Sequence, residues 1–255
     1  MLFAITREIS PAFERCELTH QPRVPIDLER ARAQHAAYEW ALVDLGCTVR
    51  RIDSGPDMPD AVFVEDMAVV LREGAIIARP GADSRRAEVV GVADALARNG
   101  VPLRDLVAPA TLDGGDVLVM GRTIFAGESS RTSAAAIAQL RRIVQPLGYT
   151  LRKVPVRECL HLKSAATAVA GSIVLVNPAW IPPDTFAGFT TIEVDPDEPN
   201  GAKALLVGET VISPAAFPKT RARLERTGLK VHAVDVDEIA KAEGGVTCCC
   251  LLYER

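Results

Sequence analysis

The chain has 255 residues, of which 48% are hydrophobic and 24% are charged, a length and composition typical of a folded protein with a sizeable core. Its 29 Lys and Arg residues and 33 Asp and Glu residues give a formal net charge of −4, which argues against nucleic acid as a partner and against a polybasic membrane-binding surface. No apolar run approaches the ~18 residues of a transmembrane helix, and the N-terminus lacks the basic segment and long apolar stretch of a secretory signal, so we expect a cytoplasmic protein without a membrane partner.

The chain predicts an internal repeat. The N-terminal segment reads as a strand at 3–5, a helix at 28–45 that ends before Gly46, and a strand at 48–52. Further along, pairs of short strands turn near Gly74, Gly121, Gly171 and Gly208, and helices are expected at 85–99, 132–147 and 219–226. About five such units arranged round an axis would bury their apolar faces together, whereas an ordinary open α/β sheet is the alternative. No Pro-, Ser- or Gly-rich linker divides the chain, so we expect one domain spanning 1–255.

An acidic run, PDAVFVED at 59–66, follows the first unit. As a strand it would place Asp60 and Asp66 on one face and Glu65 on the other. Carboxylates in apolar surroundings are costly unless they are paired or hydrogen-bonded. The run therefore indicates either edge-strand charges that face water or an acidic pocket for a cationic ligand.

The next motif is TLDGGD at 111–116. Its two glycines permit a tight backbone and close approach to neighbouring groups, and Asp113 stands immediately before them. An ordinary Asp-Gly turn is the alternative interpretation. No Lys-Ser/Thr pair follows, which argues against a phosphate-binding loop.

Two later motifs carry a histidine and a thiol. His161 lies in LHLKS, where a structural histidine is the alternative, and Cys248 is the first thiol after the Gly-Gly loop of GGVTCCC. A thiol in that place is expected to be exposed and reactive, whereas Cys249 and Cys250 are expected to fill the core. The six cysteines are too sparse for a disulfide scaffold, so we expect six reduced thiols. Together the motifs would supply a thiol nucleophile, a base, an orienting carboxylate and an acidic pocket.

As a set, the blocks PDAVFVED, RPGADSRR, TLDGGDV, ESSRTS, LHLKS and GGVTCC resemble the dimethylarginine dimethylaminohydrolase family of the pentein superfamily. The resemblance spans 59–250, and it implies a five-bladed, pseudo-symmetric α/β propeller of ββαβ modules that forms a single catalytic domain, 1–255. It implies no cofactor and no metal. It also implies a small-molecule substrate and a homodimer.

The resemblance also implies roles for individual residues. Cys248 matches the nucleophile, His161 the general acid/base, and Asp113 the carboxylate that orients the histidine. The expected substrate contacts are Asp60, Glu65 and Asp66 around the guanidinium, Arg85 and Arg131 at the carboxylate end, and Leu18 and Ala242 largely through backbone. Lys203 departs from the Asn associated with its position.

The implied activity is hydrolysis of methylated arginine to citrulline and dimethylamine or methylamine through a covalent thiouronium intermediate. The alternative within the superfamily is an arginine deiminase-like enzyme or another guanidine hydrolase. Two other classes stay open: a catalytically silent arginine-binding protein, and a zinc protein that uses the cysteine cluster, although adjacent cysteines match tetrahedral zinc poorly. Because the acidic pocket would disfavour a thiolate, we expect a bound cation to lower the pKa of the Cys248 thiol.

Overall fold

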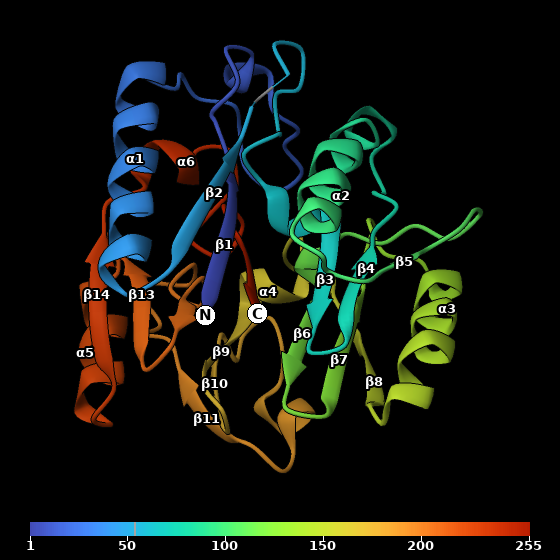
Figure 1. The fold of residues 1–255 in the computed structure, drawn as a ribbon. Coiled ribbons are helices and arrows are strands. Elements are labelled where there is room, and N and C mark those ends of the chain that lie inside the picture. Colours follow the sequence, from blue (N-terminus) through green and yellow to red (C-terminus); the bar gives the residue numbers. More distant parts are fainter. Residues whose placement is uncertain (54) are drawn as a thin grey trace.

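The protein folds into five small sheets of three strands each, arranged in a ring (Figure 1). The computed structural model describes residues 1–53 and 55–255. In every sheet the middle strand pairs antiparallel with one neighbour and parallel with the other. The sheets are β15-β1-β2 (Leu251–Glu254, Leu2–Arg7, Thr48–Ile52), β3-β4-β5 (Ala68–Leu71, Gly74–Ile77, Leu103–Asp105), β6-β7-β8 (Val117–Met120, Thr123–Glu128, Thr150–Pro155), β9-β10-β11 (Ala166–Ala170, Ile173–Val176, Thr190–Glu193) and β12-β13-β14 (Leu205–Val207, Thr210–Pro214, Lys230–Val234).

The antiparallel outer strand of each sheet faces the axis of the ring. Strand β15 contacts β3, and β9 contacts both β6 and β12. A central cavity is lined by one or more residues from each of these five strands, including Val69, Leu118, Ala168, Leu205 and Leu251. The pseudo-symmetric α/β propeller expected from the repeat is therefore confirmed.

Helices make the crossovers that parallel strands require. In four sheets a helix joins the middle strand to its parallel neighbour, and in Figure 1 these helices lie on the outside of the ring. They are α1 (Leu28–Asp44), α2 (Glu88–Arg98), α3 (Ala134–Val144) and α5 (Pro218–Arg226). Asp27 caps α1 by accepting from the Arg30 N–H, and Ser133 caps α3 by accepting from the Ala136 N–H. In the fourth sheet the crossover contains only a 3₁₀ turn, Pro183–Phe186, which explains why that copy of the repeat is weak in the sequence.

The first sheet is closed by the two ends of the chain. The C-terminal strand β15 pairs with β1, with Leu2 opposite Glu254, and the termini lie next to each other in Figure 1. The predicted strand at 3–5 is present within β1, but its C-terminal partner was not predicted. The sequence signal there was a short apolar run, which fits a core segment as well as a strand.

The acidic run at 59–66 is not a strand, and this prediction was wrong. The segment forms turns and a 3₁₀ helix, Val64–Met67, with hydrogen bonds from the Phe63 N–H to the Asp60 carbonyl and from the Asp66 N–H to the Phe63 carbonyl. Asp60 and Asp66 nevertheless line one pocket, and Glu65 lines a different cavity. The expected separation of Asp60 and Asp66 from Glu65 is therefore present, although the segment is not a strand.

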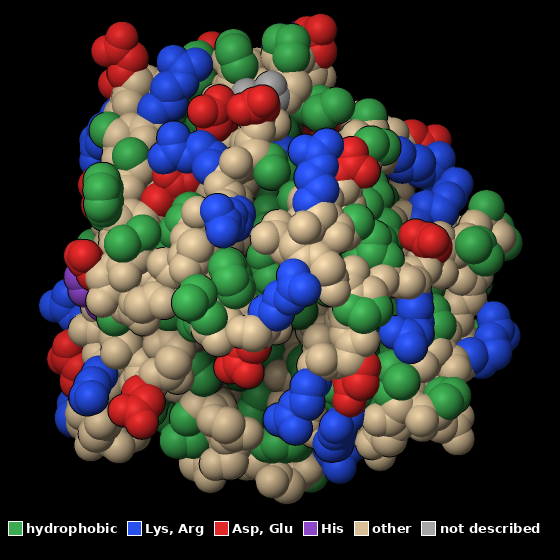
Figure 2. All heavy atoms as spheres, in the orientation of Figure 1, with side chains coloured by type: hydrophobic (Ala, Val, Ile, Leu, Met, Phe, Trp, Pro, Cys, Tyr) green, Lys and Arg blue, Asp and Glu red, His purple; other side chains and the backbone are tan. Residues whose placement is uncertain are grey.

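The described residues contain no helix that combines the length and the apolar character needed to cross a membrane. On the face drawn in Figure 2, acidic and basic side chains are interspersed, with no broad area of one charge sign. That pattern agrees with the small net charge of −4.

Candidate active site

A small pocket brings together most of the residues that the sequence indicated. Seven of the ten predicted residues line it: Asp60, Asp66, Arg85, Arg131, His161, Ala242 and Cys248. Asp113 lies directly behind His161. Leu18 and Glu65 are not among the lining residues, and Glu17 lines the pocket next to Leu18.

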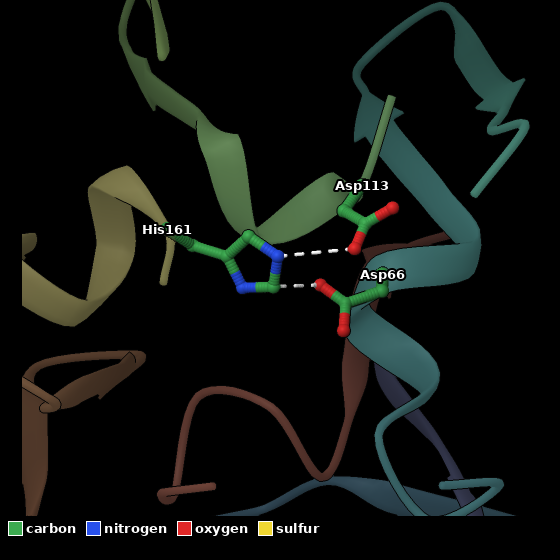
Figure 3. Close-up of side chains that lie close together, drawn as sticks. All are labelled: Asp66, Asp113 and His161. Carbon is green, nitrogen blue, oxygen red and sulfur yellow. Dashed lines mark hydrogen bonds and ion pairs between the residues drawn. The ribbon is translucent and has the colours of Figure 1, made fainter. Parts of the chain in front are cut away.

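His161 and Asp113 form a buried pair (Figure 3). Oδ2 of Asp113 lies 3.1 Å from Nε2 of His161, and its Oδ1 accepts a hydrogen bond of 2.8 Å from the Gly81 N–H. Arg131 adds a longer ion pair, with Nη1 3.6 Å from Oδ2 of Asp113. The carboxylate is thus fixed on both oxygens, and it fixes the ring of His161 in turn.

Asp66 faces the other nitrogen of the ring (Figure 3). Its Oδ1 accepts from the Gly115 N–H at 3.0 Å and lies 3.8 Å from Nδ1 of His161. Its Oδ2 lies 2.6 Å from Nη1 of Arg85. The 3₁₀ helix Val64–Met67 supplies Asp66, and the chain just before strand β9 supplies His161. Two acids from different parts of the chain therefore lie together on one side of the imidazole (Figure 3).

The glycine pair of the DGGD motif is needed for this close packing. A Cβ on Gly114 would lie 2.0 Å from the carbonyl oxygen of Glu65, and a Cβ on Gly115 would lie 2.7 Å from Nδ1 of His161. The close approach expected at these glycines is present, and it is an approach to the acidic segment and the histidine. The last residue of the motif, Asp116, accepts from the Leu162 N–H at 2.9 Å and so holds the backbone next to His161.

Cys248 is the accessible thiol of its cluster. It is partly exposed in the pocket, whereas Cys249 and Cys250 are buried, and all six cysteines are free thiols. The Cys249 thiol donates to the Gly245 carbonyl at 3.4 Å, away from the pocket. The Cys248 carbonyl accepts from the Glu65 N–H at 3.1 Å, which ties the thiol loop to the acidic segment.

Glu65 faces the central cavity rather than the pocket. Its carboxylate pairs with Nζ of Lys163 at 2.8 Å, and both residues line that cavity. Burial raises the pKa of Glu65, and Lys163 opposes the rise. Lys163, in the LHLKS motif, was not among the predicted residues, and only its position two residues after His161 could have indicated it.

The two predicted arginines differ in how tightly their guanidinium groups are bound by neighbouring residues. Arg85 is 3% exposed, and its guanidinium pairs with Asp66 at 2.6 Å and Glu88 at 2.9 Å. It also donates to the carbonyls of Asp60 and Phe63. Among the residues that the structure describes, the guanidinium of Arg131 makes only the long ion pair to Asp113 and a weak hydrogen bond of 3.4 Å to Thr19. The guanidinium of Arg131 is therefore the freer of the two.

The charges of the pocket set the protonation states of the acid/base pair. Burial lowers the pKa of His161, but the carboxylates around it outweigh burial and raise the pKa to about 9. Burial raises the pKa of the Cys248 thiol to about 11, and Glu65 and Asp66 add to the rise. At neutral pH the empty pocket thus holds an imidazolium and a neutral thiol.

Asp66, Asp113 and His161 are also the one group of the described residues that could hold a metal ion, with ligand atoms within 4.8 Å of one another. Asp66 already faces the guanidinium of Arg85 and the Gly115 N–H. A second cation there would compete with Arg85 for the same carboxylate. The geometry therefore suits an imidazolium better than a metal.

Known proteins share these features. A family model described as N,N dimethylarginine dimethylhydrolase, eukaryotic, matches residues 17–185. The N(G),N(G)-dimethylarginine dimethylaminohydrolase of Streptomyces coelicolor is 42% identical over 96% of this chain and 94% of its own.

Two solved structures are similar as well. The Pseudomonas aeruginosa enzyme of the same name, as a cysteine-to-serine mutant complexed with citrulline, superposes with a TM-score of 0.94 at 31% identity over 98% of both chains. The N-terminal domain of ArgZ, an arginine dihydrolase, has a TM-score of 0.90 at 17% identity over 100% of this chain and 98% of its own, which shows a shared fold alone. On these matches, the chain belongs to the dimethylarginine dimethylaminohydrolase family.

Proposed function

We propose that this protein hydrolyses asymmetric dimethylarginine and monomethylarginine to citrulline and dimethylamine or methylamine. One observation carries the proposal: in a chain of this family, the partly exposed thiol of Cys248 shares a pocket with His161 and with the buried carboxylates of Asp60 and Asp66. The citrulline complex of the similar Pseudomonas enzyme supports the choice of product.

In this proposal the guanidinium binds between the acids. Asp60 and Asp66 form charge-assisted hydrogen bonds to it, and Glu65 contributes its charge from the central cavity. A dimethylated nitrogen has no N–H to donate, so its subsite should not present a desolvated carboxylate. Leu18 and Ala242 contact the substrate largely through backbone.

The substrate's carboxylate end is assigned chiefly to Arg131. Its guanidinium makes only a long ion pair and a weak hydrogen bond to the described residues, whereas Arg85 is bonded to Asp66 and Glu88. Arg85 stays a proposed contact in the pocket wall, and its main effect is to hold Asp66 in place.

In the first half-reaction the bound guanidinium lowers the pKa of the Cys248 thiol, the thiol loses its proton to solvent, and the thiolate adds to the central guanidinium carbon. The bond from that carbon to the methylated nitrogen then breaks, and the His161 imidazolium gives its proton to the departing amine. Because the pKa of His161 is raised to about 9, the acid form is present at neutral pH. The products of this step are free dimethylamine and a thiouronium ester of Cys248.

In the second half-reaction His161, now neutral, removes a proton from water. The hydroxide adds to the thiouronium carbon, the carbon–sulfur bond breaks, sulfur leaves as thiolate, and the added hydroxyl loses its remaining proton to solvent to give the citrulline carbonyl. Asp113 keeps Nε2 of His161 engaged throughout, so the same ring nitrogen, Nδ1, serves both proton transfers. Water supplies the oxygen of citrulline.

A product assay tests the proposal. The protein is incubated separately with dimethylarginine, monomethylarginine and arginine, and citrulline, dimethylamine, methylamine and ammonia are quantified, with Cys248→Ser as the control. We expect citrulline and dimethylamine in equal amounts from dimethylarginine. Citrulline and ammonia from arginine alone would instead identify a deiminase, and binding without turnover would identify an arginine-binding protein. A homodimer and a cytoplasmic location remain predictions that sedimentation and cell fractionation would test.

A further inference from the structure

Lys203 is a buried lysine directly behind the loop that carries the thiol. It is 6% exposed and is not among the residues that line the candidate active site. It lies instead on the walls of two neighbouring cavities, next to Asn200 in both. Any effect of Lys203 on a bound substrate therefore passes through the loop at 243–248.

The side chain of Lys203 supports the first three residues of that loop. Nζ donates to the carbonyl oxygens of Glu243 at 2.8 Å and of Gly244 at 3.4 Å. The aliphatic stem packs on Gly245, where a Cβ would lie 2.9 Å from Cδ and 3.0 Å from Cβ of Lys203. The turn then closes with the Cys248 N–H donating to the Gly245 carbonyl at 3.2 Å. Lys203 thus fixes the backbone just before the thiol.

The loop needs this support because its first residue has an unusual conformation. Glu243 has φ of 60°, a left-handed value that side chains other than glycine rarely adopt. Such a conformation persists only where the surroundings hold it in place. The hydrogen bond from Lys203 to the Glu243 carbonyl is one of those constraints.

The charge of Lys203 has no carboxylate partner at close range. Both of its hydrogen bonds go to carbonyl oxygens, and within 1–53 and 55–255 it makes no ion pair. A buried cation without a partner is costly. Burial accordingly lowers the pKa of Lys203, and the groups of opposite charge that counteract this from further away are Cys248, Glu243 and Cys159. A thiolate at Cys248 would therefore serve as its counter-charge.

The charged groups around Cys248 have opposing effects on the pKa of its thiol, and the charge of Lys203 is one of them. Glu65 and Asp66 act on the thiol from the acidic segment and raise its pKa, while Lys203 and the Thr247 hydroxyl lower it. His161 faces the same pocket as an imidazolium. Lys203 thus opposes the effect of the two acids on the thiol.

We propose that Lys203 is a positioning residue for Cys248, which holds the 243–245 backbone from behind and supplies the buried positive charge that favours the thiolate. The inference rests on the proposed role of Cys248 as the nucleophile. Lys203 is the residue at which this chain departs from the Asn that the family resemblance associates with this position.

The test measures the alkylation of Cys248 by iodoacetamide, a neutral reagent, from pH 6 to pH 11. The modified peptide is quantified by mass spectrometry in the unaltered protein, Lys203→Gln and Lys203→Met. Gln keeps a donor for the carbonyls without the charge, whereas Met keeps only the bulk of the stem. We expect the thiol titration to move to higher pH in both variants, with alkylation at pH 8 about tenfold slower. We also expect kcat to fall by a similar factor while KM stays within about twofold.

Lys241→Gln is the matched control. Lys241 lines the same outer cavity as Lys203, but it is paired with Glu238 at 2.7 Å, so its loss should leave the titration of the thiol unchanged. A titration in Lys203→Gln that coincides with that of the unaltered protein would overturn the inference, even if Lys203→Met were impaired. If Lys203→Gln and Lys203→Met do not fold, Lys203→Arg, which keeps the positive charge, is measured instead. A thiol titration at the same pH as in the unaltered protein would support the inference, and a titration at higher pH would overturn it.

Alkylation needs no substrate, so the two proposals fail separately. If methylated arginine gives no citrulline but the titration moves as expected, the proposed function fails and the inference about Lys203 stands. If citrulline forms and the thiol titration does not move, the proposed function stands and the inference about Lys203 fails.

Discussion

Oδ1 of Asp66 lies 3.8 Å from Nδ1 of His161, on the same side of the ring as the 3.1 Å contact between Asp113 and Nε2 (Figure 3). Two buried carboxylates thus approach the same side of the imidazole, with ligand oxygens within 4.8 Å of each other. Because Asp113 occupies Nε2, the proposed mechanism assigns proton transfer to Nδ1, and Asp66 is the acid within ion-pair distance of that nitrogen. Asp66 therefore influences both the binding of a cation and the protonation of the histidine.

The first prediction concerns the pKa of His161. A titration by NMR should give a value of about 9 in the unaltered protein. Asp66→Asn should lower it toward the ordinary ~6.5, because its carboxylate stabilises the imidazolium, and Asp113→Asn should lower it as well. Asp94→Asn, on the exposed side of α2, is the control. A His161 titration that does not respond to Asp66→Asn would contradict the geometry in Figure 3.

A second prediction follows for stability. Since the pKa of His161 is raised from 6.5 to about 9 in the folded protein, its protonation stabilises the fold fully below pH 6.5. That contribution is lost as pH rises through 9, and it amounts to at most on the order of 3 kcal/mol. The depressed pKa of Asp66, about 2, acts outside this range.

The measurement compares urea unfolding of the unaltered protein and His161→Gln between pH 6 and pH 9.5. The free energy of unfolding of the unaltered protein, relative to that of His161→Gln, should fall as the pH rises from 6 to 9.5. A difference that is constant with pH would mean that His161 is not protonated preferentially in the fold.

A third prediction concerns Gly115→Ala. The added methyl group would lie 2.7 Å from Nδ1 of His161 and 2.8 Å from Oδ1 of Asp66, both on buried side chains, so one of them must move. We expect a loss of stability of roughly 1–3 kcal/mol and at least about a tenfold loss of kcat, as expected when a misplaced side chain disturbs catalytic geometry. Gly171→Ala is the control, because a Cβ there meets nothing within 4 Å. Equal activity of the two variants would show that the packing around His161 accommodates an added methyl group without disturbing the reaction.

Much of the fold could be predicted because each module repeats the same local signals. Turn glycines such as Gly121 and Gly208, with φ of 58°, have conformations that other residues resist, so they mark the hairpins in the sequence. The pairing of β15 with β1 joins the two ends of the chain, and no local pattern reports such a contact. The 3₁₀ segment Val64–Met67 was missed because its apolar residues have the composition of a strand.

The candidate site was predictable as a set of motifs but not as a set of contacts. Spacing and resemblance indicated Arg85 and Glu65, but not that Arg85 is bonded to Glu88, or that Glu65 turns toward Lys163. Those partners lie on other elements or on another turn, and they are fixed by tertiary packing. Lys203 carried a signal only as a departure from an expected residue.

A fourth prediction concerns the loop before the first helix. Oε1 of Glu243 accepts from the backbone N–H groups of Thr19 at 3.0 Å, Gln21 at 2.6 Å and also His20. Charge-assisted hydrogen bonds are roughly twice as strong as neutral ones. In Glu243→Gln we expect these three amides to exchange with deuterium about tenfold faster, as for a loop that opens more often. Glu209→Gln, on an exposed hairpin turn, is the control, and unchanged exchange in Glu243→Gln would show that the loop is held by other contacts.

The last prediction concerns how a thiol with a pKa of about 11 becomes a nucleophile at neutral pH. Burial and the carboxylates of Glu65 and Asp66 disfavour the thiolate in the empty pocket. A guanidinium bound between the acids would cancel their repulsion and add a positive charge beside the sulfur, so the pKa of the Cys248 thiol should fall. The rate of alkylation of Cys248 against pH should therefore shift to lower pH when methylguanidine is added at a concentration that calorimetry shows to be saturating. In Asp66→Asn the empty pocket should start from a lower pKa and respond less, because one of the opposed charges is already gone. If saturating methylguanidine leaves the profile of the unaltered protein where it was, the thiolate must arise by another route, and the acids of the pocket would then serve only to bind the cation.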